Sequence, residues 1–291
     1  MSAGPSSAEV GVPPRNMVFD HGAVDDRYPF FNGNPLASLM FVVFSGIFPA
    51  GERFFVDTVR AFRDRIDDPV LKAQVSGFIG QEALHGREHE RLNQVFASRG
   101  IAVDVPDRYV RWSLRQLKRL PARQQLACTI LMEHFTAHLA EQWLTDETFK
   151  ATSDPETMKL WLWHAVEELE HKAVAYDVFE AVGGTRAERA AAGVLVLGVL
   201  LPGVVASWGV LLAKEGRLTD VRGNLRGLGF LFGRRGFLTG VARQLPAFFT
   251  RRFHPAQHDT RALEAAWREI LFGADGRLKA EFRNREALAA A

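Results

Sequence analysis

Two short motifs in the chain place an imidazole three residues after a carboxylate. They are Glu82-Ala-Leu-His85 and Glu168-Leu-Glu-His171. In a helix, positions three apart are surface neighbours, so the two side chains of each motif would share one face. Carboxylate oxygens and imidazole nitrogens are common metal ligands, and each motif is therefore a candidate half of a metal site. Two matches to so short a motif are weak evidence by themselves.

Two further glutamates lie in apolar stripes of helical spacing. Glu52 shares a stripe with Phe48 and Phe55, and Glu133 shares another with Ile130. A charge within a buried stripe is costly unless it is paired or bound to a metal. The alternative is that these glutamates are solvated helix residues, as most glutamates are. Their apolar neighbours favour burial.

Long helices are expected to position the two motifs and the two single glutamates. Asn34-Pro35, Asp68-Pro69 and Asp154-Pro155 each place a capping residue before a proline, which is typical of a helix start. Pro121 divides the third helical region, and Gly183-Gly184 ends the last. The expected helices cover residues 35–66, 69–98, 107–119, 121–149 and 155–182.

The candidate residues lie at matched distances from the expected loops. In an antiparallel hairpin, residues equidistant from the turn lie at the same height. The midpoint between Glu52 and the first motif falls near residue 68, and that between Glu133 and the second motif near residue 151. Each hairpin thus brings one glutamate opposite one Glu-x-x-His motif. Two facing hairpins supply four carboxylates and two imidazoles, the ligand set of a di-metal carboxylate bundle.

Composition narrows the class of protein. The 291 residues are 24% charged with a net charge of +2, which argues against a nucleic-acid partner. The single cysteine, Cys128, excludes a disulfide framework and a cysteine-rich zinc or iron–sulfur site. No stretch alternates like a strand, so an all-α protein is predicted. The N-terminus has no basic segment followed by an apolar run, which predicts a cytoplasmic location.

Three stretches carry a resemblance to known proteins: NPLASLMFVVFSGIFPAGERFF (34–55), FIGQEALHGREHERLN (78–93) and WHAVEELEHKAVAYDVF (163–179). Over roughly residues 30–260 the chain resembles the bacterial family named predicted metal-dependent hydrolases. The order of its motifs is similar to that of ferritin-like di-iron proteins. This resemblance implies a ferritin-like antiparallel four-helix bundle with additional C-terminal helices.

The same resemblance implies two bound metal ions, most often iron, with manganese and zinc as alternatives. Carried over by position, the metal ligands are Glu52, Glu82, His85, Glu133, Glu168 and His171. Glu82 and Glu168 are the candidates for bridging the two ions. Glu167 competes with Glu168 for the ligand role and is the second choice, because it lies farther from the inward direction.

Two more histidines, His89 and His164, lie one helical turn from the motifs near the inward face. Each is an additional ligand, a proton donor or an ordinary hydrogen-bonded interior histidine. We favour the last two roles and name both as candidate catalytic residues, since groups around a metal site commonly orient its ligands.

Three functions fit such a site. The first is dioxygen-dependent oxidation or hydroxylation of an apolar small molecule or lipid, which requires an electron donor. Phe48, Phe55, Phe78 and Val174 would form the apolar lining. The alternative is hydrolysis, in which two metals polarise a carbonyl or phosphoryl group, as the family name implies. The third is metal storage or non-catalytic metal binding.

The remaining chain divides around the bundle. Residues 1–33 are expected to form a flexible arm or a segment draped over the surface, residues 34–184 the di-metal bundle, and residues 185–291 an apolar helix or hairpin followed by basic helices. Residues 190–213 carry no charge, and Pro202-Gly203 divides them. A buried helix and a membrane span are the alternatives to a membrane-associated hairpin at the cytoplasmic face. In that hairpin, nearby arginines would contact anionic headgroups: Arg234, Arg235, Arg251 and Arg252.

Overall fold

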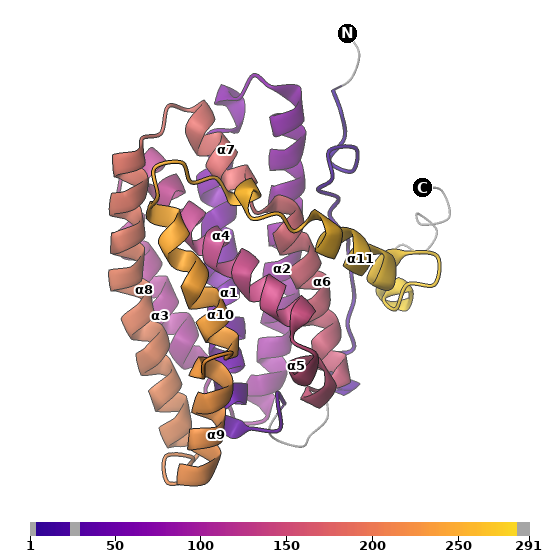
Figure 1. The fold of residues 1–291 in the computed structure, drawn as a ribbon, viewed down its shortest axis with the longest axis vertical. Helices are drawn as coiled ribbons and strands as arrows, with labels where there is room; N and C mark the ends of the chain where they lie inside the picture. Colours follow the sequence, from indigo (N-terminus) through magenta and orange to yellow (C-terminus); the bar gives the residue numbers. More distant parts are fainter. Residues whose placement is uncertain (1–3, 24–29, 284–291) are drawn as a thin grey trace.

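Every regular element in the described chain is helical. The computed structural model describes residues 4–23 and 30–283 (Figure 1). Within these ranges it contains no β-strand, only an isolated bridge between Met17 and Phe282. The all-α prediction is therefore confirmed. The α-helices are α1 Pro35–Arg60, α2 Pro69–Ser98, α3 Asp104–Leu117, α4 Ala122–Thr145, α5 Glu147–Thr152, α6 Pro155–His171, α7 Val174–Ala181, α8 Arg186–Lys214, α9 Val221–Phe232, α10 Phe237–Gln244 and α11 Arg261–Phe272.

Four of these helices form the central bundle. Helix α1 packs on α2, α4 packs on α6, and the α1–α4 and α2–α6 contacts join the two pairs. The buried apolar residues fall into two clusters along the bundle, one containing Phe48 and Trp161 and the other Phe55 and Phe78. On α1, α2 and α4 the candidate glutamates and histidines lie between these clusters, and His171 at the end of α6 lies between Leu169 of the first cluster and Val174 of the second. The core therefore has a polar layer sandwiched between two apolar ones.

The three predicted helix starts are confirmed. The side chains of Asn34, Asp68 and Asp154 each accept a hydrogen bond from a backbone N–H in the first turn of α1, α2 and α6. Each is followed by a proline at the first helical position, where no N–H is needed. These caps fix where the helices begin, and so they fix the positions of the candidate residues along the bundle axis.

Four expected helices end earlier than the sequence suggests, α3 by only two residues. Helix α1 stops at Arg60 and is followed by a 3₁₀ turn at Arg63–Arg65. Asp146 ends α4 and caps α5 by accepting from the backbone N–H of Phe149. The single helix expected over 155–182 is divided, because α6 ends at His171 and α7 begins two residues beyond Lys172. There, the Lys172 ammonium donates to the carbonyl of His258.

The apolar segment is one continuous helix, α8, so the expected hairpin division at Pro202-Gly203 was wrong. A proline inside a helix leaves a carbonyl of the preceding turn without its usual donor. Pro202 offers no N–H to the carbonyl of Gly198, and Tyr109 Oη on α3 donates to the next carbonyl, that of Val199, over 2.6 Å. The Tyr109 ring lies so close to Gly203 that no side chain would fit there. Helix α8 runs beside α3 along one edge of the bundle (Figure 1).

The N-terminal segment lies against α2. Val12, Met17 and Phe19 are buried in the described part of this segment. Gly77 and Gly80 on α2 leave room for it, since a Cβ at Gly77 would lie 2.2 Å from the Val12 carbonyl oxygen. Residues 12–19 thus lie along α2, where Arg87 and Arg91 donate to the carbonyls of Met17 and Phe19. Residues 1–3 and 24–29 of that expected arm lie outside the described residues.

Candidate metal centre

The polar layer of the bundle contains all six residues expected to be metal ligands. Each side chain is at most 2% exposed. One comes from α1, two from α2, one from α4 and two from α6: Glu52, Glu82, His85, Glu133, Glu168 and His171. The capped helix starts and matched hairpin heights thus bring residues from four helices to one buried place.

These side chains form two groups of possible ligand atoms, and within each group the atoms lie within 4.8 Å of one another. The first group is Glu52, His85 and His164, and the second is Glu82, Glu133, Glu168 and His171. Glu168 links the groups, because its Oε1 atom is 3.7 Å from His85 Nδ1 and 3.7 Å from His171 Nε2. The arrangement can hold two cations with one carboxylate between them.

Several of these atoms are left without hydrogen bonds in the described part of the structure. Both carboxylate oxygens of Glu52 and of Glu133 form none, and neither does His85 Nδ1 or Glu168 Oε2. A buried polar atom without a partner is costly, and native proteins rarely contain one unless it has another role. Cations at the two groups would satisfy these atoms, so the donor set fits a pair of metal ions.

The two motif histidines are held by their outer nitrogens. His85 Nε2 lies 2.9 Å from Glu167 Oε2, and His171 Nδ1 donates to Gln81 Oε1 over 2.8 Å. When an outer nitrogen donates, the inner nitrogen offers a lone pair to the centre, which is how ligand histidines are commonly oriented. Glu167, the second-choice ligand, therefore lies behind His85 and outside the two groups.

Arg15 joins the supports of both histidines. Its guanidinium lies 3.0 Å from Glu167 and 2.7 Å from Glu170, and it is 8% exposed. Glu170 also accepts from Gln81 Nε2 over 2.8 Å. One buried arginine from the N-terminal segment thus connects, through three side chains, to the outer nitrogens of His85 and His171.

His164 and His89 form a directed chain of hydrogen bonds. Ser45 Oγ donates to Asn93 Oδ1, so it accepts from His89 Nδ1 over 3.0 Å. His89 Nε2 then accepts from His164 Nδ1 over 2.9 Å, so His164 Nε2 can donate to Glu168 in the metal-free chain or offer a lone pair to a cation.

That nitrogen faces the centre. His164 Nε2 lies 2.8 Å from Glu168 Oε1 and 3.8 Å from Glu52 Oε1. A lone pair and a carboxylate repel at such a distance unless a proton or a cation lies between them. His164 therefore offers a donor atom to the first group, whereas His89 lies one residue farther out and contacts His164.

The carboxylates of the centre titrate abnormally in the metal-free chain. Burial raises the pKa of Glu52 and Glu133 well above the ordinary value, and neighbouring carboxylates add to the effect. Burial also raises the pKa of Glu82 to about 7. For Glu168, hydrogen bonds from His164 and His171 outweigh burial and hold the pKa well below the ordinary value.

Metal binding is expected to release protons. Near neutral pH the metal-free centre holds protons on Glu52, Glu133 and His171. The pKa of His171 is raised well above its ordinary value, because its hydrogen bonds to the Glu168 and Glu82 carboxylates outweigh burial. Ligands must be deprotonated, so cations displace these protons. Titration calorimetry in two buffers of different ionisation enthalpy measures the number released. Equal heats in both buffers would contradict the expectation.

The same pKa shifts predict the pH dependence of folding without metal. Between about pH 6.5 and 8 the folded chain keeps protons on the raised carboxyls, including Glu167, whose pKa burial raises to about 8, while the unfolded chain has lost them. Stability therefore falls as pH rises through this window. Burial lowers the pKa of His85 and His89, which makes stability rise with pH. This opposite effect acts only below about pH 6.5, where the unfolded chain protonates these histidines. Denaturant unfolding with and without metal checks it: metal loading should remove the decline.

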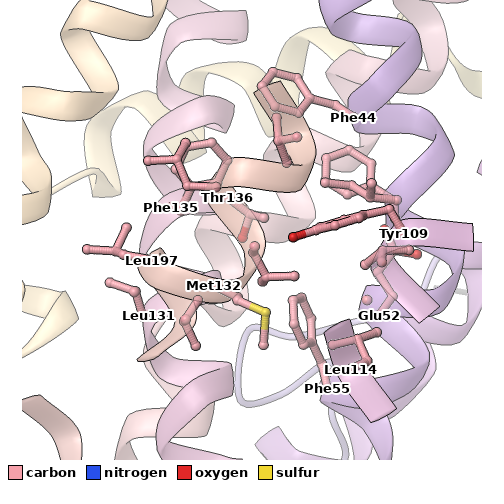
Figure 2. Close-up of a pocket in the computed structure, with 18 of the residues that line it drawn as sticks. Phe44, Glu52, Phe55, Tyr109, Leu114, Leu131, Met132, Phe135, Thr136 and Leu197 are labelled. Atoms are coloured by element: carbon pink, nitrogen blue, oxygen red, sulfur yellow. The ribbon is translucent and has the colours of Figure 1, made fainter. Parts of the chain in front are cut away.

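An apolar pocket of about 140 Å³ reaches the centre from α8 (Figure 2). Its walls come from α1, α3, α4 and α8 together with Leu245. The only carboxylate among its lining residues is Glu52, a member of the first ligand group. Phe48 also lines the pocket and contacts the rings of His89 and His164. A molecule entering this pocket would be apolar over most of its length and would meet the centre at Glu52.

A second cluster of ligand-type side chains lies outside the centre. Glu141 Oε2 is 3.3 Å from His138 Nδ1 and 2.9 Å from His258 Nε2. The carboxylate thus already has both imidazoles as partners. Because His258 comes from the C-terminal segment, these contacts fasten that segment to α4.

The geometry can be compared with known families. The family model described as predicted metal-dependent hydrolase matches residues 13–259. The chain belongs to this family. No curated protein and no solved structure matches the chain. Membership implies a metal-dependent hydrolase, and the buried groups of histidine and glutamate could hold the metal.

The family match extends beyond the bundle to include Arg15 and His258. In this predicted metal-dependent hydrolase, sequence reasoning missed Arg15, Gln81 and Glu170 as supports of the ligand histidines. Gln81 directly precedes Glu82, and Glu170 directly precedes His171, so position beside a motif residue was the available signal. Arg15 has no such signal, since it lies in a segment without periodicity.

Proposed function

We propose that the chain is a two-metal hydrolase built on a ferritin-like bundle. The observation that carries this proposal is the pair of buried donor groups with unpartnered oxygens and nitrogens, joined by Glu168. Membership in a family of predicted metal-dependent hydrolases supports it. The ligands in this proposal are the six predicted residues together with His164.

The types of donor atom indicate which metals could bind at the centre. A mixture of carboxylates and imidazoles suits iron, manganese and zinc, and the chain has no cysteine among the donors. We propose iron as the first choice, with manganese and zinc as alternatives. Glu168, the carboxylate close to both groups, would lie between the two ions in this proposal, whereas Glu82 belongs to the second group alone.

The residues of the chain perform three tasks in the reaction. When bound, two divalent cations supply Lewis acidity for a substrate carbonyl and activate a water molecule. The apolar pocket binds the substrate chain and directs its reacting end toward Glu52. Glu167 and Gln81 hold the ligand histidines in orientation. His89 does not reach the centre, so it positions His164 and is not a catalytic residue in this mechanism.

Dioxygen-dependent oxidation is the second candidate. A specific observation favours it: the pocket lining is almost entirely apolar, and the second donor group contains three carboxylates and one imidazole. An enclosed, carboxylate-rich site suits oxidation of an apolar molecule. This function needs an external electron donor, whereas hydrolysis needs only water.

Metal reconstitution separates the two functions. The metal-free chain is loaded with Fe²⁺, Mn²⁺ or Zn²⁺ and supplied with p-nitrophenyl esters of increasing acyl length under nitrogen. Hydrolysis predicts turnover without dioxygen, including with redox-inert Zn²⁺, and a preference for longer chains. Turnover only with iron, accompanied by dioxygen consumption, would reject the hydrolase proposal in favour of oxidation. A chain that binds no metal would reject both.

A further inference from the structure

The surface of α8, α9 and the turn between them carries apolar side chains that the rest of the described chain leaves uncovered. Over the most apolar window of α8, only 22% of the residues are buried. By comparison, 89% of the corresponding window of α1, the other long apolar helix, is buried. Most of the exposed large apolar side chains of the described chain lie on this surface: Val194, Leu195, Leu201, Val205, Val210, Leu218, Val221, Leu225, Leu228 and Phe232. We call these ten residues the α8–α9 face.

Basic side chains border this face. On α9, Val221, Leu225, Leu228 and Phe232 follow one stripe at helical spacing, and Arg222 lies about 90° from it around the helix axis. Arg226 follows on the same side, and Arg234 and Arg235 come directly after α9, all with exposed side chains. Along α8 no charged residue interrupts the face between Arg189 and Lys214. An apolar stripe bordered by arginines is the pattern of a helix that lies in the interface of an anionic bilayer.

The apolar pocket begins at this face. Leu201 lines the pocket and is also 54% exposed, so it belongs to both. Leu197, Leu200 and Val204 continue the α8 wall inward. At the other side of the pocket lies Glu52 of the metal centre (Figure 2). An apolar chain lying against α8 would therefore have an apolar path toward the centre.

We propose that the α8–α9 face docks on a bilayer that contains anionic phospholipid, and that the pocket receives an acyl chain from it. Docking stands independently of the chemistry, whereas the acyl chain as substrate rests on the proposed function. A second copy of the chain is the competing occupant. In a symmetric dimer the same face meets itself, so the bordering arginines of the two copies would approach one another. Anionic headgroups complement those arginines.

Vesicle co-sedimentation tests the docking. The full chain is mixed with vesicles of phosphatidylcholine alone or with phosphatidylglycerol added. We expect binding to the anionic vesicles and at least about tenfold weaker binding to the neutral ones, because each arginine contributes to attraction. Val205→Glu places a charge in the face at an exposed position and should reduce binding at least about tenfold. Val70→Glu is the matched control, because Val70 is an exposed residue of α2 outside this face. This variant should bind like the wild type.

Two results would overturn the docking proposal. One is wild-type chain that remains in the supernatant with both kinds of vesicle, and the other is equal loss of binding in the Val205→Glu and Val70→Glu variants. Light scattering measures whether a second copy of the chain covers the face. A dimer that Val205→Glu converts to a monomer, together with no vesicle binding, would assign the face to a second copy.

Ligand binding tests the pocket separately. Gly51 lines the pocket, and a Cβ added there meets nothing within 4 Å, so the Gly51→Leu variant is designed to take up pocket space. We expect this variant to bind a fluorescent fatty acid at least about tenfold more weakly than the wild type. Gly209→Leu, an exposed helix position on α8, is the matched control. Unchanged binding in Gly51→Leu would reject the pocket as the acyl site. This readout needs no turnover, so it fails independently of the hydrolase proposal.

Discussion

Replacing Glu168 with glutamine is expected to remove metal from both donor groups and to reduce activity at least about a hundredfold, or about 3 kcal/mol of transition-state stabilisation. Glu168 is the carboxylate that approaches both His85 and His171. Glutamine keeps the shape of the side chain and loses the negative charge that two cations would share. Metal content by mass spectrometry and turnover of the reconstituted variant measure the effect.

Two further variants sharpen this experiment. Glu90→Gln changes an exposed glutamate on the same helix as His85 and should leave metal content unchanged. Glu133→Gln imitates a carboxyl whose pKa is already raised by burial, so the metal-free fold should keep its stability while the second donor group loses affinity. If Glu168→Gln binds as much metal as the wild type, the proposed bridging role is wrong.

Arg15→Ala is expected to destabilise the fold by about 3–5 kcal/mol, because it leaves buried carboxylates without their cation. The guanidinium contacts both Glu167 and Glu170, and these side chains are buried. Burial already raises the pKa of Glu167 to about 8, with Arg15 opposing the shift. Without the arginine the pKa of Glu167 would rise further, so its carboxyl would be neutral over a wider pH range and would hold His85 Nε2 less strongly. Metal affinity should therefore fall about 10–100-fold as well.

Denaturant unfolding and metal titration together check the role of Arg15. Arg115→Ala, an exposed arginine on α3, is the matched control and should change stability by less than about 0.5 kcal/mol. Arg15→Ala combined with Glu167→Gln should recover part of the loss, since fewer buried charges remain unpaired. A wild-type unfolding midpoint for Arg15→Ala would show that the ion pairs add no stability.

The bundle and the place of its polar layer could be predicted because both depend on local signals. Capping residues followed by proline fix where α1, α2 and α6 begin. Helical spacing then places Glu52 and Glu133 on inward faces, and the hairpin midpoints place them opposite the two motifs. These signals need no knowledge of distant contacts. How the ligands divide between two groups could not be predicted, because His164 joins the first group through side-chain packing across helices.

Features that depend on contacts distant in sequence were missed. Helix α8 continues through Pro202, and beside the proline Tyr109, a residue of another helix, donates its hydroxyl to the Val199 carbonyl. The support of both ligand histidines by Arg15 likewise requires a fold that brings the N-terminal segment beside α6. Residue types alone carry no sign of these pairings, since arginine and tyrosine most often lie at the surface.

The separation of 152 residues between Arg15 and Glu167 has a consequence for biogenesis. During synthesis the arginine leaves the ribosome long before α6 has been translated. Contacts that close so large a loop carry a high entropic cost and form late. The imidazole of His85 is therefore locked in place only after the nascent chain extends past α6, so metal acquisition belongs near the end of translation or after it.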